Sequence, residues 1–305
     1  MRLAVPDLVS NSYFPAIAAV ELGYMRDEGL DVELELLFPV TDAAVALRNG
    51  DVDLVAGSAH APLYADPHWQ DVQILAALAQ NMYWFLVVRP DLEVTPETLT
   101  TMKDLRIGAA PGPDRGLRQL LVDVGIDVQQ ANITIAPVAG TGGDNVSFGV
   151  TAARALGDGQ IDAFWANGMG AEVAVRQGVG RVVVDARRDG GPAASYTFPA
   201  LLASRNTIEN RPEETAAAVR AVVRVQHDLR AKPELATRVG NALFPSMEAG
   251  LIAELVKRDA DFYDPSVSPD AITSLIAFAQ ATGLTQDSLD YDQVVATMAR
   301  PLWTS

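Results

Sequence analysis

The sequence contains no cysteine, only three histidines and only three lysines. Without cysteine the chain forms no disulfide, has no thiolate nucleophile and binds no metal through cysteine. The histidines, His60, His68 and His227, are too few for a multi-histidine metal site. We therefore expect no metal and no organic cofactor.

The sequence also lacks long apolar runs and basic stretches. No apolar run reaches the roughly 18–20 residues of a membrane span, so we expect no membrane insertion. A net charge of −16 argues against nucleic acid as a partner. No basic-then-apolar leader precedes the strand predicted at residues 3–5. The sequence as written is therefore expected to be cytoplasmic, or periplasmic if a leader was removed.

The sequence does contain one pattern that occurs twice, at residues 28–57 and 124–168. Each copy begins with a Gly-apolar-Asp-Val helix exit that leads into a strand, and continues through a helix that ends at glycine. Each then opens a short strand with an apolar-Asp-apolar step, centred on Asp53 and on Asp162. Two copies of one α/β unit predict two Rossmann-like lobes with a ligand cleft between them, because small-molecule sites favour such clefts.

Strand and helix signals alternate through the first two-thirds of the 305 residues, which predicts an α/β fold with parallel or mixed sheets. From residue 212 onward the pattern predicts a helical C-terminal segment, with its last helix at residues 290–299. A break at residues 89–91 and a turn-rich stretch before residue 196 indicate crossings between lobes. We therefore assign residues 1–89 and 196–305 to lobe I and residues 90–195 to lobe II.

Four stretches carry a family resemblance: residues 14–32, Asn49-Gly50-Asp51-Val52-Asp53, Leu105-Arg106-Ile107-Gly108 and Gly159-Gln160-Ile161-Asp162-Ala163. Together they resemble the type II periplasmic-binding-protein fold, in its nitrate/sulfonate/taurine and pyrimidine-precursor branch of solute-binding proteins. The resemblance covers essentially the whole chain. It implies hinge closure on a small-molecule ligand and delivery to an importer, with an ABC membrane permease as partner.

The same resemblance leaves an enzyme open, because a minority of relatives work in the cytoplasm as enzymes. Hydroxymethylpyrimidine phosphate synthases and aryl-sulfinate desulfinases depend on cysteine, which this chain lacks. The dihydroxyphthalate decarboxylase-like branch needs none. The first hypothesis is therefore a solute-binding protein for a small organic anion or heteroaromatic compound. The alternative is a cofactor-independent decarboxylase of an aromatic or heteroaromatic acid. A ligand sensor would need an effector domain, and none is visible.

In doubly wound sheets the ligand lies beyond the carboxyl ends of the strands. In lobe I, the loop at residues 7–13 is rich in cap and turn residues, and it can serve an anion or only cap the next helix. Thr41 is either a ligand contact or a helix cap. His60 is the proton donor if the protein is an enzyme. The candidate ligand-binding residues of these loops are Ser10, Asn11, Ser12, Tyr13, Thr41, Ser58 and His60.

In lobe II, Arg115 follows a Gly/Pro loop and can clamp a carboxylate or sulfonate, or pair with Asp114. Residues 140–145 are glycine-rich but lack the Lys-Ser/Thr of a P-loop, so a loop beside the ligand is favoured over nucleotide binding. Glu172 is a ligand contact or a first-turn helix acid. The candidates of lobe II are Arg115, Thr141, Asn167 and Glu172. Tyr83, just before the first crossover, and Tyr196, near the second, are the remaining ligand-binding candidates.

Overall fold

The computed structural model describes residues 1–141 and 147–304. Its contacts divide the chain into two compact units, the first formed by Met1–Asn81 with Ser195–Ser305 and the second by Met82–Ala194. The chain leaves the first unit earlier than the boundary predicted at residue 89. The reason is that the strand Trp84–Val88 forms its hydrogen bonds within the sheet of the second unit.

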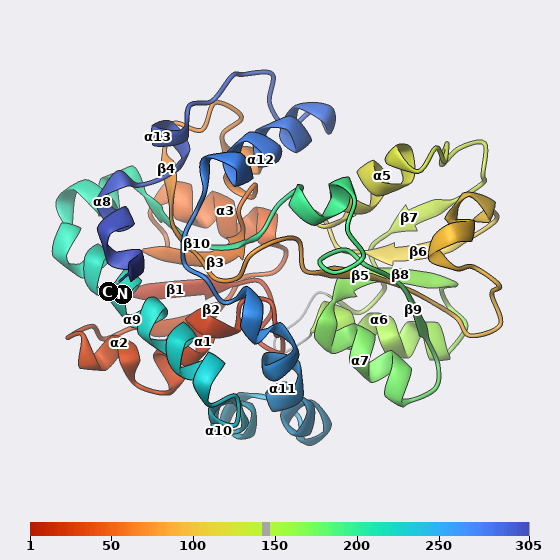
Figure 1. Cartoon of the computed structure of the whole chain (residues 1–305), viewed down its shortest axis with the longest axis horizontal. Helices are drawn as coiled ribbons and strands as arrows, with labels where there is room; N and C mark the ends of the chain where they lie inside the picture. The colour runs from red at the N-terminus through yellow and green to blue at the C-terminus, as the bar shows by residue number, and fades with distance from the viewer. Residues whose placement is uncertain (142–146, 305) are drawn as a thin grey trace. The chain divides into compact units, whose positions relative to one another are not determined.

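The first unit is built on a five-stranded sheet of order β2-β1-β3-β10-β4. Strand β1 pairs in parallel with β2 and β3, whereas β10 runs antiparallel to β3 and β4. The strands are β1 (Arg2–Val5), β2 (Glu33–Leu36), β3 (Leu54–Ser58), β4 (Val72–Ala77) and β10 (Pro199–Ser204). Its helices are α1 (Phe14–Glu21), α2 (Tyr24–Asp27), α3 (Val40–Asn49), α4 (Pro62–Ala65), α8 (Arg205–Asn210), α9 (Pro212–Ala231), α10 (Leu235–Leu243), α11 (Ser246–Asp259), α12 (Pro269–Ala281) and α13 (Tyr291–Val294) (Figure 1).

The second unit repeats this plan with the order β7-β6-β8-β5-β9, in which β5 is the antiparallel strand. Helices α6 and α7 lie side by side against one face of the sheet, and α5 lies against the other (Figure 1). The strands are β5 (Trp84–Val88), β6 (Arg106–Ala109), β7 (Thr134–Ala136), β8 (Ala163–Asn167) and β9 (Arg181–Asp185). The helices are α5 (Asp114–Asp123), α6 (Phe148–Gly157) and α7 (Gly168–Arg176).

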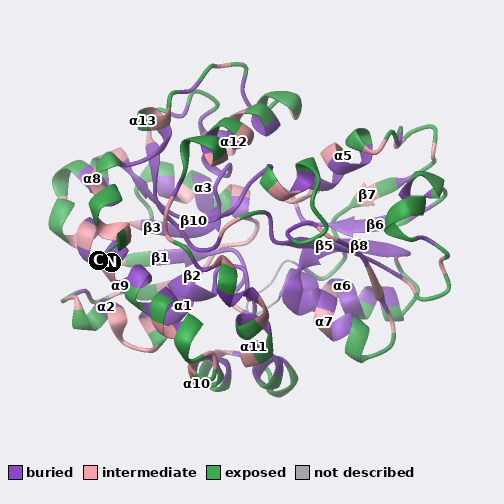
Figure 2. Cartoon of the chain, in the orientation of Figure 1, coloured by how far each residue is buried: buried purple, intermediate pink, exposed green. Residues whose placement is uncertain are grey.

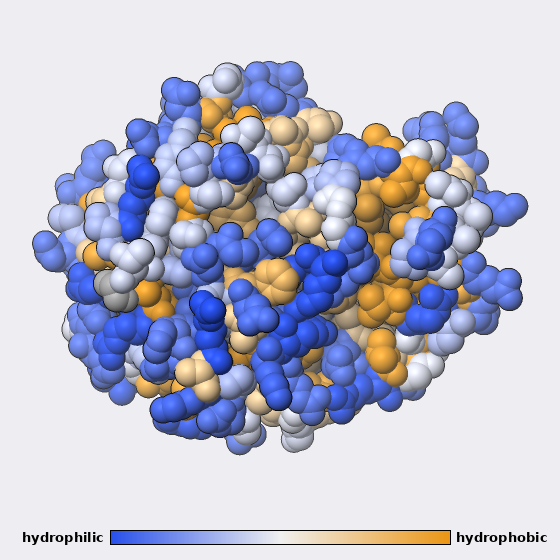
Figure 3. All heavy atoms as spheres, in the orientation of Figure 1, coloured by the Kyte–Doolittle hydropathy of each residue, from blue (hydrophilic) through white to orange (hydrophobic). Residues whose placement is uncertain are grey.

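The interior strands of both sheets are buried, and the outer faces of the helices are exposed (Figure 2). In the first unit, a cluster of apolar side chains from β3, β4 and β10 packs against α3 and α12. Hydrophilic residues predominate on the visible surface over α9 and α10 (Figure 3). Within the described part of the chain, no helix combines the length and the apolar composition that a bilayer crossing requires.

The repeated glycines of the sequence pattern have the same backbone role in both units. Gly29 and Gly125 adopt φ angles of +83° and +82°, which strain any residue with a Cβ atom. The residue after each glycine then donates its backbone N–H to a carbonyl in the preceding helix, so that the last turn is closed before the next strand begins. The pattern therefore marks the exits of α2 and α5.

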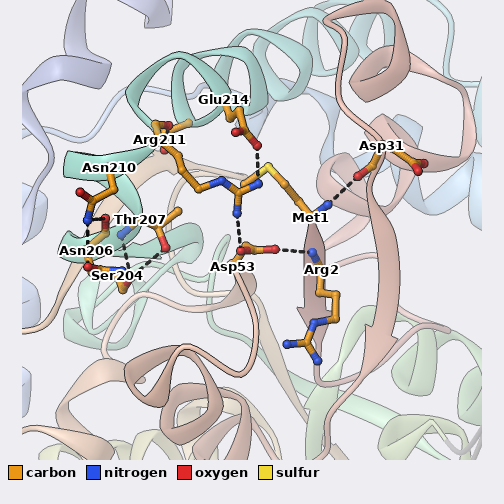
Figure 4. A network of polar contacts seen from close by, with 11 residues as sticks. Met1, Arg2, Asp31, Asp53, Ser204, Asn206, Thr207, Asn210, Arg211 and Glu214 are labelled. Carbon is orange, nitrogen blue, oxygen red and sulfur yellow. Dashed lines mark hydrogen bonds and ion pairs between the residues drawn. The ribbon is translucent and has the colours of Figure 1, made fainter.

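The repeated aspartates also have one shared role, which lies at the amino ends of the strands. Asp53 Oδ2 accepts the backbone N–H of Arg2 at 2.7 Å, and Asp53 N–H donates to the Arg2 carbonyl at 3.0 Å. In the second unit the corresponding distances between Arg106 and Asp162 are 2.9 and 2.8 Å. Asp53 Oδ1 also accepts a hydrogen bond from the guanidinium of Arg211 at 2.6 Å (Figure 4). Each aspartate thus joins the starts of two neighbouring parallel strands.

The helix predicted at residues 290–299 is wrong. Helix α13 stops at Val294, because Val295 forms a parallel bridge with Ile74 of β4 and Ala296 N–H donates to the Ile74 carbonyl at 2.9 Å. A 3-10 segment, Thr297–Thr304, follows. Pairing with the edge strand therefore overrides the local helical pattern.

Candidate functional site

The parallel strands of each unit end at one edge of their sheet, and the predicted site residues follow these ends. We call "first edge" the loops after β1, β2, β3 and β4, with the first turn of α3 and the segment that leads into β10. We call "second edge" the loops after β6, β7, β8 and β9, with the first turns of α5, α6 and α7 and the residues that lead into β5. The first edge carries Ser10, Asn11, Ser12, Tyr13, Thr41, Ser58, His60 and Tyr196, and the second carries Tyr83, Arg115, Thr141, Asn167 and Glu172.

The loop after β1 is organised by its own polar side chains. Ser10 Oγ accepts the Ser12 backbone N–H at 3.0 Å, and Asn11 Nδ2 donates to Asp259 Oδ2 at 2.6 Å. Tyr13 is the N-cap residue of α1, and its own side chain forms no capping hydrogen bond with the described residues. The buried Ser12 hydroxyl forms no hydrogen bond with the described residues. Ser12 therefore retains a hydroxyl for another partner.

Thr41 and Ser58 flank this loop on the first edge. Thr41 lies in the first turn of α3, after the N-cap residue Pro39, and its hydroxyl is 3.4 Å from Asp42 Oδ1. The helix-cap alternative for Thr41 is therefore wrong. Ser58 is the last residue of β3 and is fully buried, opposite Pro199 of β10.

His60 lies at the centre of an aromatic cluster on the first edge. Its side chain is fully buried, and its Nδ1 lies 3.0 Å from Thr197 Oγ1. The Phe278 ring meets the imidazole edge-on with the ring centres 5.4 Å apart, and Tyr196 stacks on Phe278 at 4.9 Å. The Tyr64 ring centre lies 5.7 Å from the imidazole. The imidazole is therefore enclosed by rings and tied to the segment that enters β10.

On the second edge, the starts of α6 and α7 pack backbone against backbone. An atom placed as Cβ on Gly170 would lie 2.5 Å from the Gly149 Cα, so only glycine allows this approach. Asn167 ends β8 and caps α7, because its Oδ1 accepts the Gly170 N–H at 3.1 Å. Two helix N-termini, each with positive backbone N–H groups, are thereby held together at this edge, an arrangement suited to an anion.

Arg115 and Glu172 are the charged candidates of the second edge. Arg115 lies half-buried in the first turn of α5, and the neighbouring Asp114 carboxylate pairs with Arg118 at 3.2 Å. Glu172 pairs with Arg176, one turn later on α7, at 2.8 Å. Glu172 therefore forms an ion pair along the surface of α7. The Asp114 carboxylate already has Arg118 as an ion-pair partner.

Two further candidates of the second edge are buried. Thr141 donates its hydroxyl to the Val138 carbonyl at 2.7 Å. Tyr83 has its ring centre 4.9 Å from that of Trp84. The rest of the glycine-rich run, residues 142–145, lies outside the described residues.

Sequence reasoning missed three residues that lie at or next to the edges. Trp165 contacts Trp84 at 6.1 Å between ring centres, and its buried indole Nε1 forms no hydrogen bond with the described residues. Thr197 and Phe278 complete the surroundings of His60. Thr197 could have been found because it follows Tyr196, but Phe278 has no sequence signal, since it is one of several apolar residues on α12.

The two edges offer different chemistry. The first edge supplies hydroxyls, an imidazole and aromatic rings, which suit a planar ligand with hydrogen-bonding groups. The second edge supplies a guanidinium and paired helix N-termini, which suit a negative charge. No three His, Asp or Glu side chains come together for a metal ion in residues 1–141 and 147–304.

Comparisons with known proteins support this architecture. A family model described as NMT1/THI5 like matches residues 10–236. A search of curated proteins finds no match. The periplasmic sulfonate-binding protein SsuA from Methylobacillus flagellatus KT is similar, with 17% identity, a TM-score of 0.68 and coverage of 100% of this chain and 93% of that chain.

Two other solved structures show the same likeness. For the periplasmic nitrate-binding protein NrtA from Synechocystis PCC 6803, the identity is 15%, the TM-score 0.74 and the coverage 99% of this chain and 87% of that chain. The third structure is a cysteine-to-serine mutant of DSZB, a desulfurization enzyme, in complex with biphenyl-2-sulfinic acid. Its identity is 18%, its TM-score is 0.69, and the coverage is 99% of this chain and 99% of that chain. The α/β fold predicted from the sequence is thus confirmed.

Proposed function

Because the chain belongs to the NMT1/THI5-like family, we propose that it is the solute-binding component of an ABC-type importer. Its ligand in this proposal is a small organic anion or a heteroaromatic compound, and its protein partner is the membrane permease of that importer. Solved relatives with the same fold are described as sulfonate-binding and nitrate-binding proteins of the periplasm, which supports an anionic ligand.

The observation that carries the proposal is the pairing of the α6 and α7 N-termini at the second edge. Gly149 and Gly170 allow this backbone contact, and Asn167 fixes the start of α7. In the proposal, a carboxylate or sulfonate binds at this edge with Arg115 as its guanidinium partner. The hydroxyl of Ser12 and the rings around His60 at the first edge bind the uncharged part of a ligand.

A thermal-shift screen tests the binding proposal. The library contains nitrate, alkanesulfonates, aromatic carboxylates and pyrimidines. A ligand of the native state at about 100 times its Kd stabilises the fold by about 2.7 kcal/mol, so at least one class should raise the melting temperature in a saturable way. If no compound of these classes does so, the proposal is wrong.

Matched arginine variants on α5 then locate the anion. Arg115→Gln should weaken binding of the best anion by about tenfold or more, because a charge-assisted hydrogen bond is lost. Arg118→Gln removes the same charge one turn later, from a side chain that pairs with Asp114. We expect this control to change the affinity less than twofold. Equal losses in the two variants would contradict a specific role of Arg115.

The cleft that the sequence pattern predicts stays a prediction, and a double-mutant cycle tests it. Ser12→Ala and Arg115→Gln are measured singly and together with the same ligand. If one ligand contacts both residues, each single variant weakens binding of that ligand and the double variant weakens it further. An affinity that only one of the two single variants lowers would contradict a single shared ligand.

The enzyme alternative has one supporting observation, the full-length likeness to the enzyme DSZB. Under this alternative, His60 donates a proton to the carbon that loses carbon dioxide. Incubation with each aromatic acid that stabilises the protein, followed by NMR of the ligand, tests it. Decarboxylation of the ligand by the parent protein, but not by the His60→Ala variant, would support the alternative. An unchanged ligand after prolonged incubation would leave only the binding proposal.

A further inference from the structure

The first unit carries a surface pocket of about 520 Å³ between the C-terminal half of α9 and the end of the chain. None of its lining residues belongs to either edge, and its volume is typical of small-molecule sites. We propose that this pocket is a second ligand site, which binds an aromatic carboxylate that carries a hydrogen-bond donor on its ring. The residues that the argument uses are Arg224, Gln226, Asp228, Arg230, Tyr263 and Trp303.

Among the described residues that line the pocket, one arginine is left for an anionic ligand. Arg224 pairs with Glu28 at 2.9 Å and with Asp27 at 3.7 Å. The Asp228 carboxylate accepts a tyrosine hydroxyl from α2 and lies 3.4 Å from the ring of His227. Arg230 has no carboxylate partner in the described part of the chain, and its guanidinium donates a hydrogen bond to the Tyr263 carbonyl at 3.4 Å. A ligand carboxylate can therefore pair with Arg230 through two hydrogen bonds.

The aromatic wall of the pocket is Trp303. Its indole N–H donates to the Leu75 carbonyl at 2.9 Å, which fixes the ring against β4. The side chain is half-buried, and the buried Tyr263 also lines the pocket. A planar ring can bury its face against this surface and stack on the indole.

Gln226 supplies the acceptor. Its amide nitrogen donates to the Ala77 and Leu78 carbonyls at 3.0 and 2.8 Å, so the orientation of the amide is fixed. The buried Gln226 Oε1 accepts no hydrogen bond from the described residues. A buried acceptor without a donor is costly, and a hydroxyl or amino group on the ligand would satisfy it. This is why the proposed ligand carries a donor as well as a carboxylate.

Fluorescence titration with 4-hydroxybenzoate tests the proposal. The chain has four tryptophans, and Trp69, Trp84 and Trp165 are buried, so quenching by a ligand in this pocket reports Trp303. Excitation is set at the red edge of the indole band, where the probe does not absorb. We expect saturable quenching that is lost in Trp303→Phe. Benzoate, without the donor, and 4-hydroxybenzamide, without the charge, should each bind at least severalfold more weakly.

Calorimetry on an arginine pair provides the control. Arg230→Gln should raise the Kd of 4-hydroxybenzoate about tenfold or more. Arg238→Gln removes the same charge from an exposed position on α10 and should leave the Kd within twofold. Quenching that does not saturate, quenching retained in Trp303→Phe, or equal Kd values in the two arginine variants would overturn the proposal. If Trp303→Phe does not fold, the arginine pair alone decides.

Discussion

Asp162 and Arg106 form hydrogen bonds with each other through both their backbones and their side chains. Besides the reciprocal backbone contacts at the starts of β6 and β8, Arg106 Nε donates to Asp162 Oδ2 at 2.9 Å. The hydrogen bond from Arg106 is the main cause that lowers the pKa of the Asp162 carboxyl, against the opposing effect of burial. The second copy of the repeated aspartate is therefore a strand-joining residue.

We expect Asp162→Asn to destabilise the protein by about 1–2 kcal/mol, because a charge-assisted hydrogen bond to a largely buried carboxylate is lost. The pKa of Asp162 is lower in the folded state than in the unfolded state. Its contribution is therefore present above the unfolded pKa, near 3.8, and is lost as the pH falls through the folded pKa. Urea unfolding between pH 2 and 7 measures both effects.

The control for this variant is Asp158→Asn. Asp158 is exposed on the same unit, and we expect its replacement to change stability by less than about 0.5 kcal/mol. If the two variants lose equal stability at neutral pH, the contact between Asp162 and Arg106 contributes nothing specific.

The glycine contact between α6 and α7 makes a second prediction. Gly170→Ala places a methyl group 2.5 Å from the Gly149 Cα and 2.6 Å from its carbonyl oxygen, and backbone atoms cannot move aside easily. We expect a loss of about 2–4 kcal/mol in the free energy of unfolding and weaker binding of anions.

Gly250→Ala is the matched control on α11, because nothing lies within 4 Å of the added methyl group. In an exposed helix interior, alanine is favoured over glycine by about 0.5–1 kcal/mol, so this variant should be more stable than the parent protein. Thermal unfolding measures the stability of both variants. A change in the same direction in both would contradict the close-contact explanation.

The hydrogen bond between His60 and Thr197 makes a third prediction. Thr197→Val keeps the shape of the side chain and removes the hydroxyl that lies 3.0 Å from His60 Nδ1. We expect Thr197→Val to lower the free energy of unfolding by about 1–2 kcal/mol, since both side chains are buried. Thr197→Ser keeps the hydroxyl and should recover most of that stability in chemical denaturation. Equal losses in the valine and serine variants would assign the effect to packing.

Tyr24 makes a prediction at alkaline pH. Burial, and then its hydrogen bond to Asp228, raises the pKa of the Tyr24 phenol from 10.0 to about 12. A raised folded-state pKa means that the stabilisation is complete below pH 10 and is lost as the pH rises towards 12. Unfolding free energies should therefore fall more steeply over this interval in the parent protein than in Tyr24→Phe. Parallel curves would contradict the assignment.

The sequence alone determined the repeated features, because each depends on near neighbours or on backbone conformation. Gly29 and Gly125 need left-handed φ angles at helix exits, and a reader of the sequence can recognise both. The positions of the candidate site loops also follow from strand order, since each loop comes directly after a strand. The α/β fold was predicted from the alternation of strand and helix signals, and the family from the resemblance of four stretches to known proteins. Both predictions are confirmed.

Only the tertiary structure decided which side chains meet. His60 and Thr197 are 137 positions apart, and Phe278 reaches the same imidazole from α12. The pairing of Val295 with Ile74 likewise ended a helix that local propensity favoured. Such contacts depend on how distant segments pack and on the hydrogen bonds that this packing allows. A single sequence records the residues that make them, but not their partners.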